Sequence, residues 1–208
     1  MTTGYDYWLF DLDGTLVDVE PNYVHFVVGQ VGELIGYRFS ERQAEMLWHG
    51  IGATPEELLT QWGIDESQFW QAFHEVEDPI TRADASYLHP DAIVVGELDR
   101  PVGLVTHCQD YLTGPVLDAV DVRDWFDTIV CCSEATGWKP DPRPVERAVA
   151  DLPGSGPNGV LVGDSSSDIG AAWNAGIDGI HVERHGEDRR GCCIWADRRV
   201  RSIQELVT

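Results

Sequence analysis

Positive charge is scarce in this sequence. Among its 208 residues, 36 are acidic and 14 are basic, and the formal net charge is −22. The acidic residues are spread along the chain rather than collected in a tail. Because nucleic acids and anionic membranes are bound through basic patches, this composition argues against both as partners.

Lysine is almost absent. All but one of the basic residues are arginines, and Lys139 is the single lysine. Acid-rich, lysine-poor sequences are typical of proteins from halophiles that accumulate salt, where self-repulsion is screened because the Debye length falls to about 3 Å at 1 M salt. We therefore predict a halophilic protein, in which the one lysine has a specific function.

Long apolar stretches are missing as well. No segment approaches the roughly 20 apolar residues of a membrane span, and the N-terminus has no basic region followed by a long apolar one. The cysteines are odd in number, include two adjacent pairs and have no CxxC spacing, which argues against a disulfide framework or a zinc site. We expect a soluble cytoplasmic protein with free, buried thiols at Cys108, Cys131, Cys132, Cys192 and Cys193.

Short apolar runs recur along the chain with helix-like segments between them. The runs predicted as strands are YWLF (7–10), VGLVT (102–106), DTIVCC (127–132), GVLVG (159–163) and GIDGIHV (176–182). The segments predicted as helices are 109–119, 142–151 and 166–175. This alternation predicts an α/β fold with a doubly wound, mostly parallel sheet covered on both faces.

Residues 18–88 interrupt the alternation. They contain no comparable strand run, but three segments have helical periodicity: 23–36, 41–51 and 54–63. We predict a helical domain of residues 18–88, inserted into an α/β core domain made of residues 1–17 and 89–208.

Polar side chains stand where the predicted strands end. In open parallel α/β sheets, ligands bind at the edge where the carboxyl ends of the strands meet. The residues expected at this edge are Asp11, Asp13, Thr106, Lys139, Asp164 and Asp168. Clustered carboxylates tolerate ionisation when a hard cation and a lysine share the site. Mg²⁺ is the natural cation, because it prefers oxygen ligands and is commonly held by one or two carboxylates together with a substrate phosphate.

Four of these features follow one another in a set order: DLDGT (11–15), Thr106 at a strand end, Lys139 before a proline, and GDSSSD (163–168). In this order they resemble the four signature motifs of the haloacid dehalogenase-like (HAD) hydrolase superfamily. The resemblance covers nearly the whole chain. The inserted helical domain is similar to the C1 cap of the phosphoglycolate phosphatase-like group, and the rest to their Rossmann-like core.

The resemblance implies roles for the first motif. Asp11 is expected to attack phosphorus, form an aspartyl-phosphate and bind Mg²⁺. Asp13 is expected to act as general acid and then as general base, with its backbone carbonyl as a further metal ligand. Gly14 would let backbone N–H groups approach the phosphate closely.

The later motifs imply phosphate and metal contacts. Thr106 and Lys139 would hold the transferring phosphoryl oxygens, and the backbone of His107 would also meet the phosphate. Asp164 is the expected carboxylate ligand of Mg²⁺. Two roles stay open for Asp168, which would either reach the metal through a water molecule or anchor Lys139.

Single residues separate the branches of the superfamily. Asp13 favours phosphoryl chemistry, since haloacid dehalogenases lack this second aspartate, and a cap without lysine excludes the Schiff base of phosphonatases. Val19 and Tyr23 stand where the β-phosphoglucomutase branch has threonine and histidine. We predict a phosphatase acting on a small phosphorylated metabolite, phosphoglycolate-like or a sugar phosphate. The alternatives are a phosphotransferase or phosphomutase, and a family member that binds a ligand without turnover.

The inserted domain carries no motif that fixes the substrate. We predict that its arginines are surface residues, with the binding of a substrate carboxylate by one of them as the alternative: Arg38, Arg42 and Arg82. We expect its tryptophans to form its core: Trp48, Trp62 and Trp70. The sequence leaves a monomer and a homodimer open as the oligomeric state.

Overall fold

A computed structural model describes residues 4–184 and 194–207 of the chain. The described residues form two compact units. Unit 1 contains residues 4–18, 87–184 and 194–207, and unit 2 contains residues 19–86. We describe each unit by itself.

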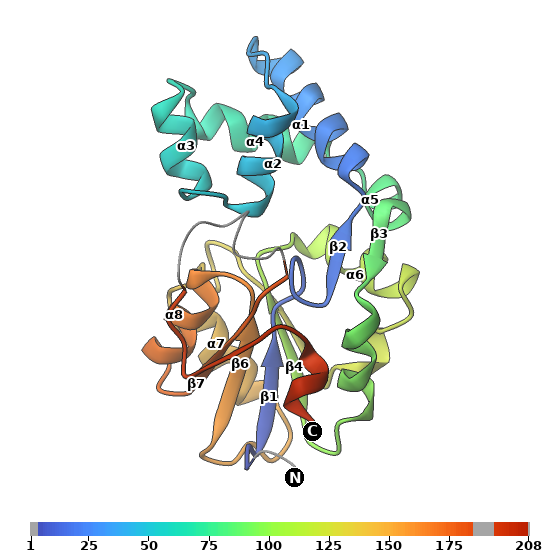
Figure 1. The fold of residues 1–208 in the computed structure, drawn as a ribbon, viewed down its shortest axis with the longest axis vertical. Coiled ribbons are helices and arrows are strands. Elements are labelled where there is room, and N and C mark those ends of the chain that lie inside the picture. The colour runs from blue at the N-terminus through green and yellow to red at the C-terminus, as the bar shows by residue number, and fades with distance from the viewer. Residues whose placement is uncertain (1–3, 185–193, 208) are drawn as a thin grey trace. The chain divides into compact units, whose positions relative to one another are not determined.

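Unit 1 is built on a six-stranded sheet with every neighbouring pair parallel (Figure 1). In spatial order the strands are β5 (Thr128–Cys131), β4 (Val102–Thr106), β1 (Tyr7–Phe10), β6 (Gly159–Gly163), β7 (Asp178–Val182) and β8 (Arg198–Val200). The predicted doubly wound α/β fold is confirmed. The edge strand β8 was not predicted, because the sequence RRV is short and carries two charges.

The two faces of the sheet bury different cores. Along β1, Trp8 and Phe10 belong to one apolar cluster, whereas Tyr7 and Leu9 belong to another on the opposite face. Because both faces are covered, the central strands are buried at every position rather than at alternate ones.

Helices cover both faces, as the alternation of segments predicts. Two helices pack on one face, α7 (Arg143–Asp151) and α8 (Ser166–Asn174). The other face is covered by α6 (Asp110–Ala119) together with the 3₁₀ helices η1 (Pro90–Glu97), η2 (Arg123–Trp125) and η3 (Ile203–Leu206) (Figure 1). Crossovers on both faces leave the carboxyl ends of the strands at one edge.

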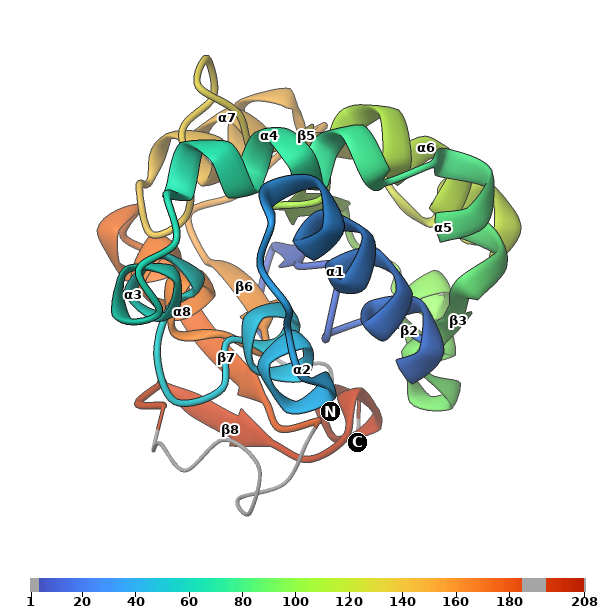
Figure 2. The same ribbon diagram turned by 90° about the horizontal axis from the view of Figure 1, so that it is seen from above.

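Unit 2 is helical. Its helices are α1 (Pro21–Ile35), α2 (Glu41–His49), α3 (Pro55–Gln61), α4 (Glu66–Val76) and α5 (Pro79–Ala85), with α1 packed against α2 and α4 (Figure 2). Ser40 and Thr54 begin α2 and α3 through capping boxes. In each box the hydroxyl accepts the backbone N–H of the third helical residue, and the side chain of that residue accepts the backbone N–H of the serine or threonine. The first three helices agree with the predicted segments, and α4 and α5 are additional.

The predicted core of unit 2 is confirmed, but one predicted surface residue is wrong. Trp48, Trp62 and Trp70 all pack against the apolar core of the unit. Arg38 and Arg42 are exposed, whereas Arg82 is only 2% exposed. The guanidinium of Arg82 lies over the rings of Tyr23 and Trp48, at 5.8 and 5.3 Å from their centroids, and such cation–π contacts stabilise a buried arginine.

The segments that join the units pair with each other. They are β2 (Val17–Val19) and β3 (Ser86–Leu88), which form a two-stranded sheet that the sequence did not predict. Among the cysteines, Cys108 and Cys132 are buried free thiols and Cys131 is a half-buried one, while Cys192 and Cys193 lie outside the described residues. In the part of the chain that the structure describes, no helix is long and apolar enough to cross a membrane.

Candidate active site

Three carboxylates come together at the carboxyl edge of the sheet. Asp11 follows β1, Asp164 follows β6, and Asp168 lies in the first turn of α8. Since β1 and β6 are parallel neighbours with Phe10 opposite Val162, their next residues reach the same edge. One oxygen from each of the three carboxylates lies within 4.8 Å of the others, and all three residues are buried.

Lys139 enters this cluster from the segment between β5 and α7. Its Nζ donates to Asp11 Oδ1 at 2.6 Å and to the carbonyl oxygen of Val105 at 2.9 Å, and it pairs with Asp168 Oδ1 at 2.6 Å. Its side chain is 2% exposed. The three contacts match the three donors of an ammonium group, so Lys139 is held in one position.

The charges in this cluster do not balance. Within the described part of the chain, one ammonium faces three clustered carboxylates. Burial raises the pKa of Asp11 well above its usual range, and the charges of Asp168 and Asp164 add to this against the opposing effect of Lys139. Burial would lower the pKa of Lys139, but Asp11 and Asp168 outweigh it and raise that pKa. A further cation would remove the excess negative charge, and the donor set of carboxylate oxygens suits Mg²⁺.

Asp168 is fixed by the start of α8. Its Oδ2 accepts hydrogen bonds from the Ser165 backbone N–H at 2.9 Å and from the Ser165 hydroxyl at 2.6 Å, while its Oδ1 pairs with Lys139. Burial opposes ionisation, but Lys139 and Ser165 outweigh it and lower the pKa of Asp168. Asp168 is therefore a buried carboxylate that holds the lysine in place.

A tight turn follows β1 and carries Asp13 and Gly14. Gly14 has φ +75°, and its N–H donates to the carbonyl of Val17 at 2.8 Å. A Cβ at Gly14 would lie 2.6 Å from Asp164 Oδ2, so a side chain here would displace that carboxylate. Asp13 is half-buried and lies outside the group of three carboxylates.

Thr15 is a site residue that the sequence analysis missed. Its hydroxyl donates to Asp164 Oδ1 at 3.3 Å, and the residue is fully buried. It stands inside the DLDGT motif, so its position was a signal that could have been used.

Thr106 ends β4 and His107 follows it, and the neighbouring strand β1 leads into Asp11. The Thr106 hydroxyl accepts the backbone N–H of Cys108 at 2.9 Å. The His107 ring makes an edge contact with the ring of Trp138, with centroids 5.6 Å apart. Desolvation by the surrounding protein and the charge on Lys139 lower the pKa of His107, although part of the residue is exposed.

A doubly wound sheet that presents buried carboxylates and a lysine at its carboxyl edge defines a Rossmann-like α/β enzyme with an acidic site. Residues 8–182 match the family model of haloacid dehalogenase-like hydrolases. The chain belongs to this family and is an enzyme, which confirms the resemblance of its four motifs.

Known proteins are similar to this chain over most of its length. A phosphoglycolate phosphatase from Caulobacter vibrioides is 32% identical over 186 residues, covering 83% of this chain and 77% of that protein. The phosphoglycolate phosphatase of Escherichia coli K12 is 29% identical, covering 82% and 78%. The crystal structure of a Lactobacillus plantarum protein has the same fold, with a TM-score of 0.79 at 22% identity over 99% of each chain.

The balance of charge around Lys139 can be tested with Lys139→Met. Removing one partner of a buried ion pair leaves its charge uncompensated, and we expect the free energy of unfolding to fall by about 3–5 kcal/mol. The pKa of Asp11, already raised, should rise further above the unfolded value of about 3.9. The folded variant then binds more protons than the unfolded chain, so its stability should increase as the pH falls through the raised pKa.

Urea unfolding from about pH 8 to about pH 6 measures this effect. Arg147→Met is the matched control, because Arg147 loses the same charge from an exposed pair with Asp151 and should unfold like the wild type. If acidification stabilises the Lys139 variant no more than the Arg147 variant, the carboxylates do not depend on Lys139 as described.

Proposed function

We propose that the protein is a Mg²⁺-dependent phosphatase that hydrolyses a small phosphorylated metabolite, phosphoglycolate-like or a sugar phosphate, through an aspartyl-phosphate on Asp11. One observation carries this proposal: three buried carboxylates cluster at one edge of the sheet, and the single buried lysine that pairs with two of them leaves an excess of negative charge. The relatives that are phosphoglycolate phosphatases support the reaction class.

The first chemical step would form the covalent intermediate. A carboxylate oxygen of Asp11 attacks phosphorus while the bond from phosphorus to the leaving oxygen breaks. Asp13 gives its proton to that leaving oxygen, which departs as an alcohol. The half-buried position of Asp13 suits this role, because a water molecule must reach its carboxylate in the second step.

The second step would return the enzyme to its starting state. Asp13, now ionised, removes a proton from a water molecule whose oxygen attacks phosphorus. The bond between phosphorus and Asp11 breaks, and inorganic phosphate leaves. The Thr106 hydroxyl and the backbone N–H of His107 would donate to the phosphoryl oxygens in both steps, and the positive charge of Lys139 would stabilise those oxygens. The N–H of Gly14 is bonded to the Val17 carbonyl, so Gly14 would act through the close approach of its backbone.

The metal would be held by the Asp11 carboxylate, the Asp13 carbonyl and the Asp164 carboxylate. When bound, Mg²⁺ would neutralise charge that develops on the phosphoryl oxygens and keep Asp11 ionised. Thr15 would orient Asp164, and Asp168 would act mainly through Lys139.

Unit 2 offers no support for the mutase alternative. Val19 is buried, and the buried Tyr23 donates its hydroxyl to Glu77 at 3.2 Å. His25, two residues further on, lies 3.3 Å from Glu45 on the neighbouring helix α2. These side chains belong to the packing of unit 2, which favours hydrolysis over phosphoryl return to a sugar.

We place this activity in the cytoplasm of a halophile, with the enzyme acting as a monomer or homodimer. The acidic, lysine-poor composition supports the saline setting. Free thiols among the described cysteines suit a reducing compartment.

The nucleophile is tested by Asp11→Asn. We expect hydrolysis of p-nitrophenyl phosphate in concentrated potassium chloride to fall about 10³-fold or more, because an amide cannot attack phosphorus. The wild type should lose activity when Mg²⁺ is chelated and regain it when Mg²⁺ is added. Asp124→Asn, an exposed aspartate, is the control for the substitution itself. Activity that survives in Asp11→Asn would disprove the mechanism.

The close approach at Gly14 is tested by Gly14→Ala. The new Cβ would meet the Asp164 carboxylate at 2.6 Å, and we expect kcat/KM to fall about 10²-fold because small displacements at a reacting centre are costly. Gly176→Ala is the matched control, since Gly176 has φ +76° but nothing within 4 Å. It should lose about 1 kcal/mol of stability and keep its activity. Equal activity in the two variants would contradict the proposed geometry.

The substrate class is tested by measuring phosphate release from phosphoglycolate, sugar phosphates, glycerol phosphate and nucleotides. We expect kcat/KM for phosphoglycolate or a sugar phosphate to exceed that for nucleotides by about tenfold or more. A nucleotide as the best substrate, or a flat and weak profile, would contradict the proposed substrate class.

A further inference from the structure

Arg184 uses its whole guanidinium on two partners inside unit 1. The residue lies two positions after the end of β7, and its side chain is 7% exposed. Nη1 donates to both carboxylate oxygens of Asp91 at 2.7 Å. Nε and Nη2 donate to the carbonyl oxygen of Thr15 at 3.0 and 2.5 Å. A single side chain therefore joins residues that are 169 and 93 positions away from it in the sequence.

Thr15 connects this contact to the candidate metal site. Its carbonyl accepts from Arg184, and its hydroxyl donates to Asp164 Oδ1. The bonds run without a break from Asp91 through Arg184 and Thr15 to Asp164. The carbonyl and the hydroxyl of Thr15 are thus both bonded to buried or nearly buried partners.

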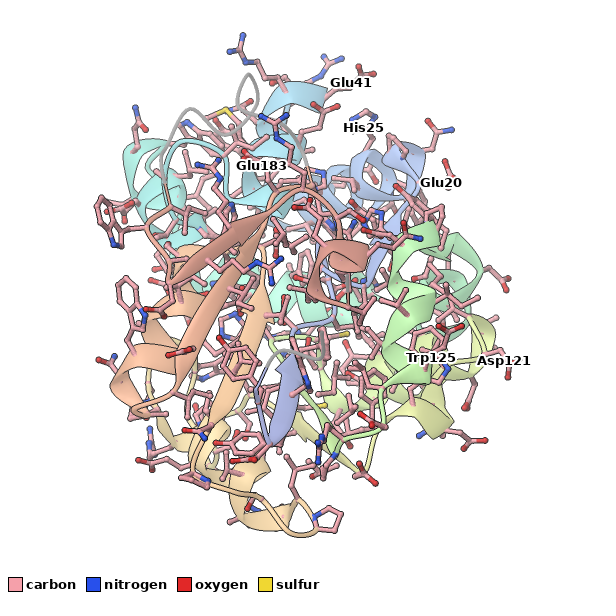
Figure 3. All side chains as sticks on the ribbon, turned by 60° about the horizontal axis from the view of Figure 1, so that its bottom comes forward. Glu20, His25, Glu41, Asp121, Trp125 and Glu183 are labelled. Atoms are coloured by element: carbon pink, nitrogen blue, oxygen red, sulfur yellow. The ribbon has the colours of Figure 1, made fainter. Side chains whose placement is uncertain are left out.

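Asp91 is itself fixed. Its Oδ2 also accepts the backbone N–H of Ile203, which begins η3, at 2.8 Å. Burial would raise the pKa of Asp91, but the bonds from Arg184 and Ile203 outweigh it and lower that pKa. On the other side, Glu183 (labelled in Figure 3) pairs with Arg199 of β8, so the segment before Arg184 is also tied down.

The two partners of Arg184 stand at special points of the chain. Thr15 lies two residues before β2, and Asp91 lies three residues after β3. These strands are the segments by which the chain leaves unit 1 and returns to it. Arg184 therefore fixes both ends of the connection from the unit 1 side.

We propose that Arg184 is a positioning residue for metal binding: it holds the Thr15 carbonyl so that the Thr15 hydroxyl presents Asp164 to Mg²⁺. This inference rests on the proposed function, in which Asp164 is a metal ligand. Arginine is required, because its planar guanidinium donates to Asp91 through Nη1 and to the Thr15 carbonyl through Nε and Nη2 at the same time. A lysine has one ammonium group and cannot hold both partners in these positions.

Calorimetric titration of the substrate-free protein with Mg²⁺ tests this directly. Loss of a residue that orients a metal ligand typically weakens metal binding 10–100-fold, and we expect Arg184→Gln to weaken it about tenfold. Arg184→Lys should restore little of the loss. Arg147→Gln removes an arginine from an exposed ion pair and should bind Mg²⁺ like the wild type.

A double-mutant cycle with Thr15→Val separates positioning from general stability. Valine has the shape of threonine without the hydroxyl, so this variant alone should also weaken Mg²⁺ binding. If Arg184 acts through that hydroxyl, adding Arg184→Gln to Thr15→Val should change the affinity by less than about twofold. Independent, multiplying losses would overturn the proposal.

Three other outcomes of these experiments would each contradict a different part of the proposal. Arg184 variants that lower the melting temperature but keep the wild-type Mg²⁺ affinity would show that the residue only stabilises the fold, and the inference would be wrong. If Arg184→Gln does not fold, Thr15→Val and Arg184→Lys still decide the question, and wild-type affinity in both would refute it. A wild type that binds no Mg²⁺ would refute the proposed metal site, and this inference with it.

Discussion

The contact between Lys139 and the buried carboxylates is the constraint on which the active site depends. Carboxylates that lie within 4.8 Å of one another repel strongly in a buried setting, and the ammonium of Lys139 offsets part of that repulsion. Because the compensation is incomplete, a bound cation would stabilise the ionised carboxylates further.

Much of the surrounding structure serves this contact. The parallel register of β1 and β6 brings Asp11 and Asp164 to one edge of the sheet. At the end of β6, a Cβ on Gly163 would lie 2.3 Å from the Asp168 carboxyl carbon, so only glycine lets α8 begin close enough to carry Asp168 to Lys139. Close packing at Gly163 and the capping of α8 therefore both help to place Asp168 beside Lys139.

The central strands, the helices α6, α7 and α8 and the cluster of polar residues at the sheet edge could be predicted from the sequence because their signals are local. Buried strands have apolar runs, and Asp11 and Asp164 directly follow such runs. Arg184 and Arg82 could not be predicted in the same way. Their partners are a backbone carbonyl and aromatic rings distant in sequence, and neither kind of partner leaves a pattern beside the arginine. Short polar strands such as β8 depend on a neighbouring strand rather than on their own residues.

The acidic surface would repel a phosphorylated substrate, whereas the proposed site would have to attract it. A net charge of −22 repels an anion at long range, and the exposed arginines Arg123, Arg143 and Arg147 are already paired with aspartates. In concentrated salt this repulsion acts only over a few ångströms, since the Debye length is about 3 Å at 1 M. A buried pair such as Lys139 and Asp11 is screened much less, so the charge of Lys139 would still act on a phosphate bound beside it. In a saline cell interior, a strongly acidic protein could therefore bind an anionic substrate, because only the charges inside the site would act on that substrate.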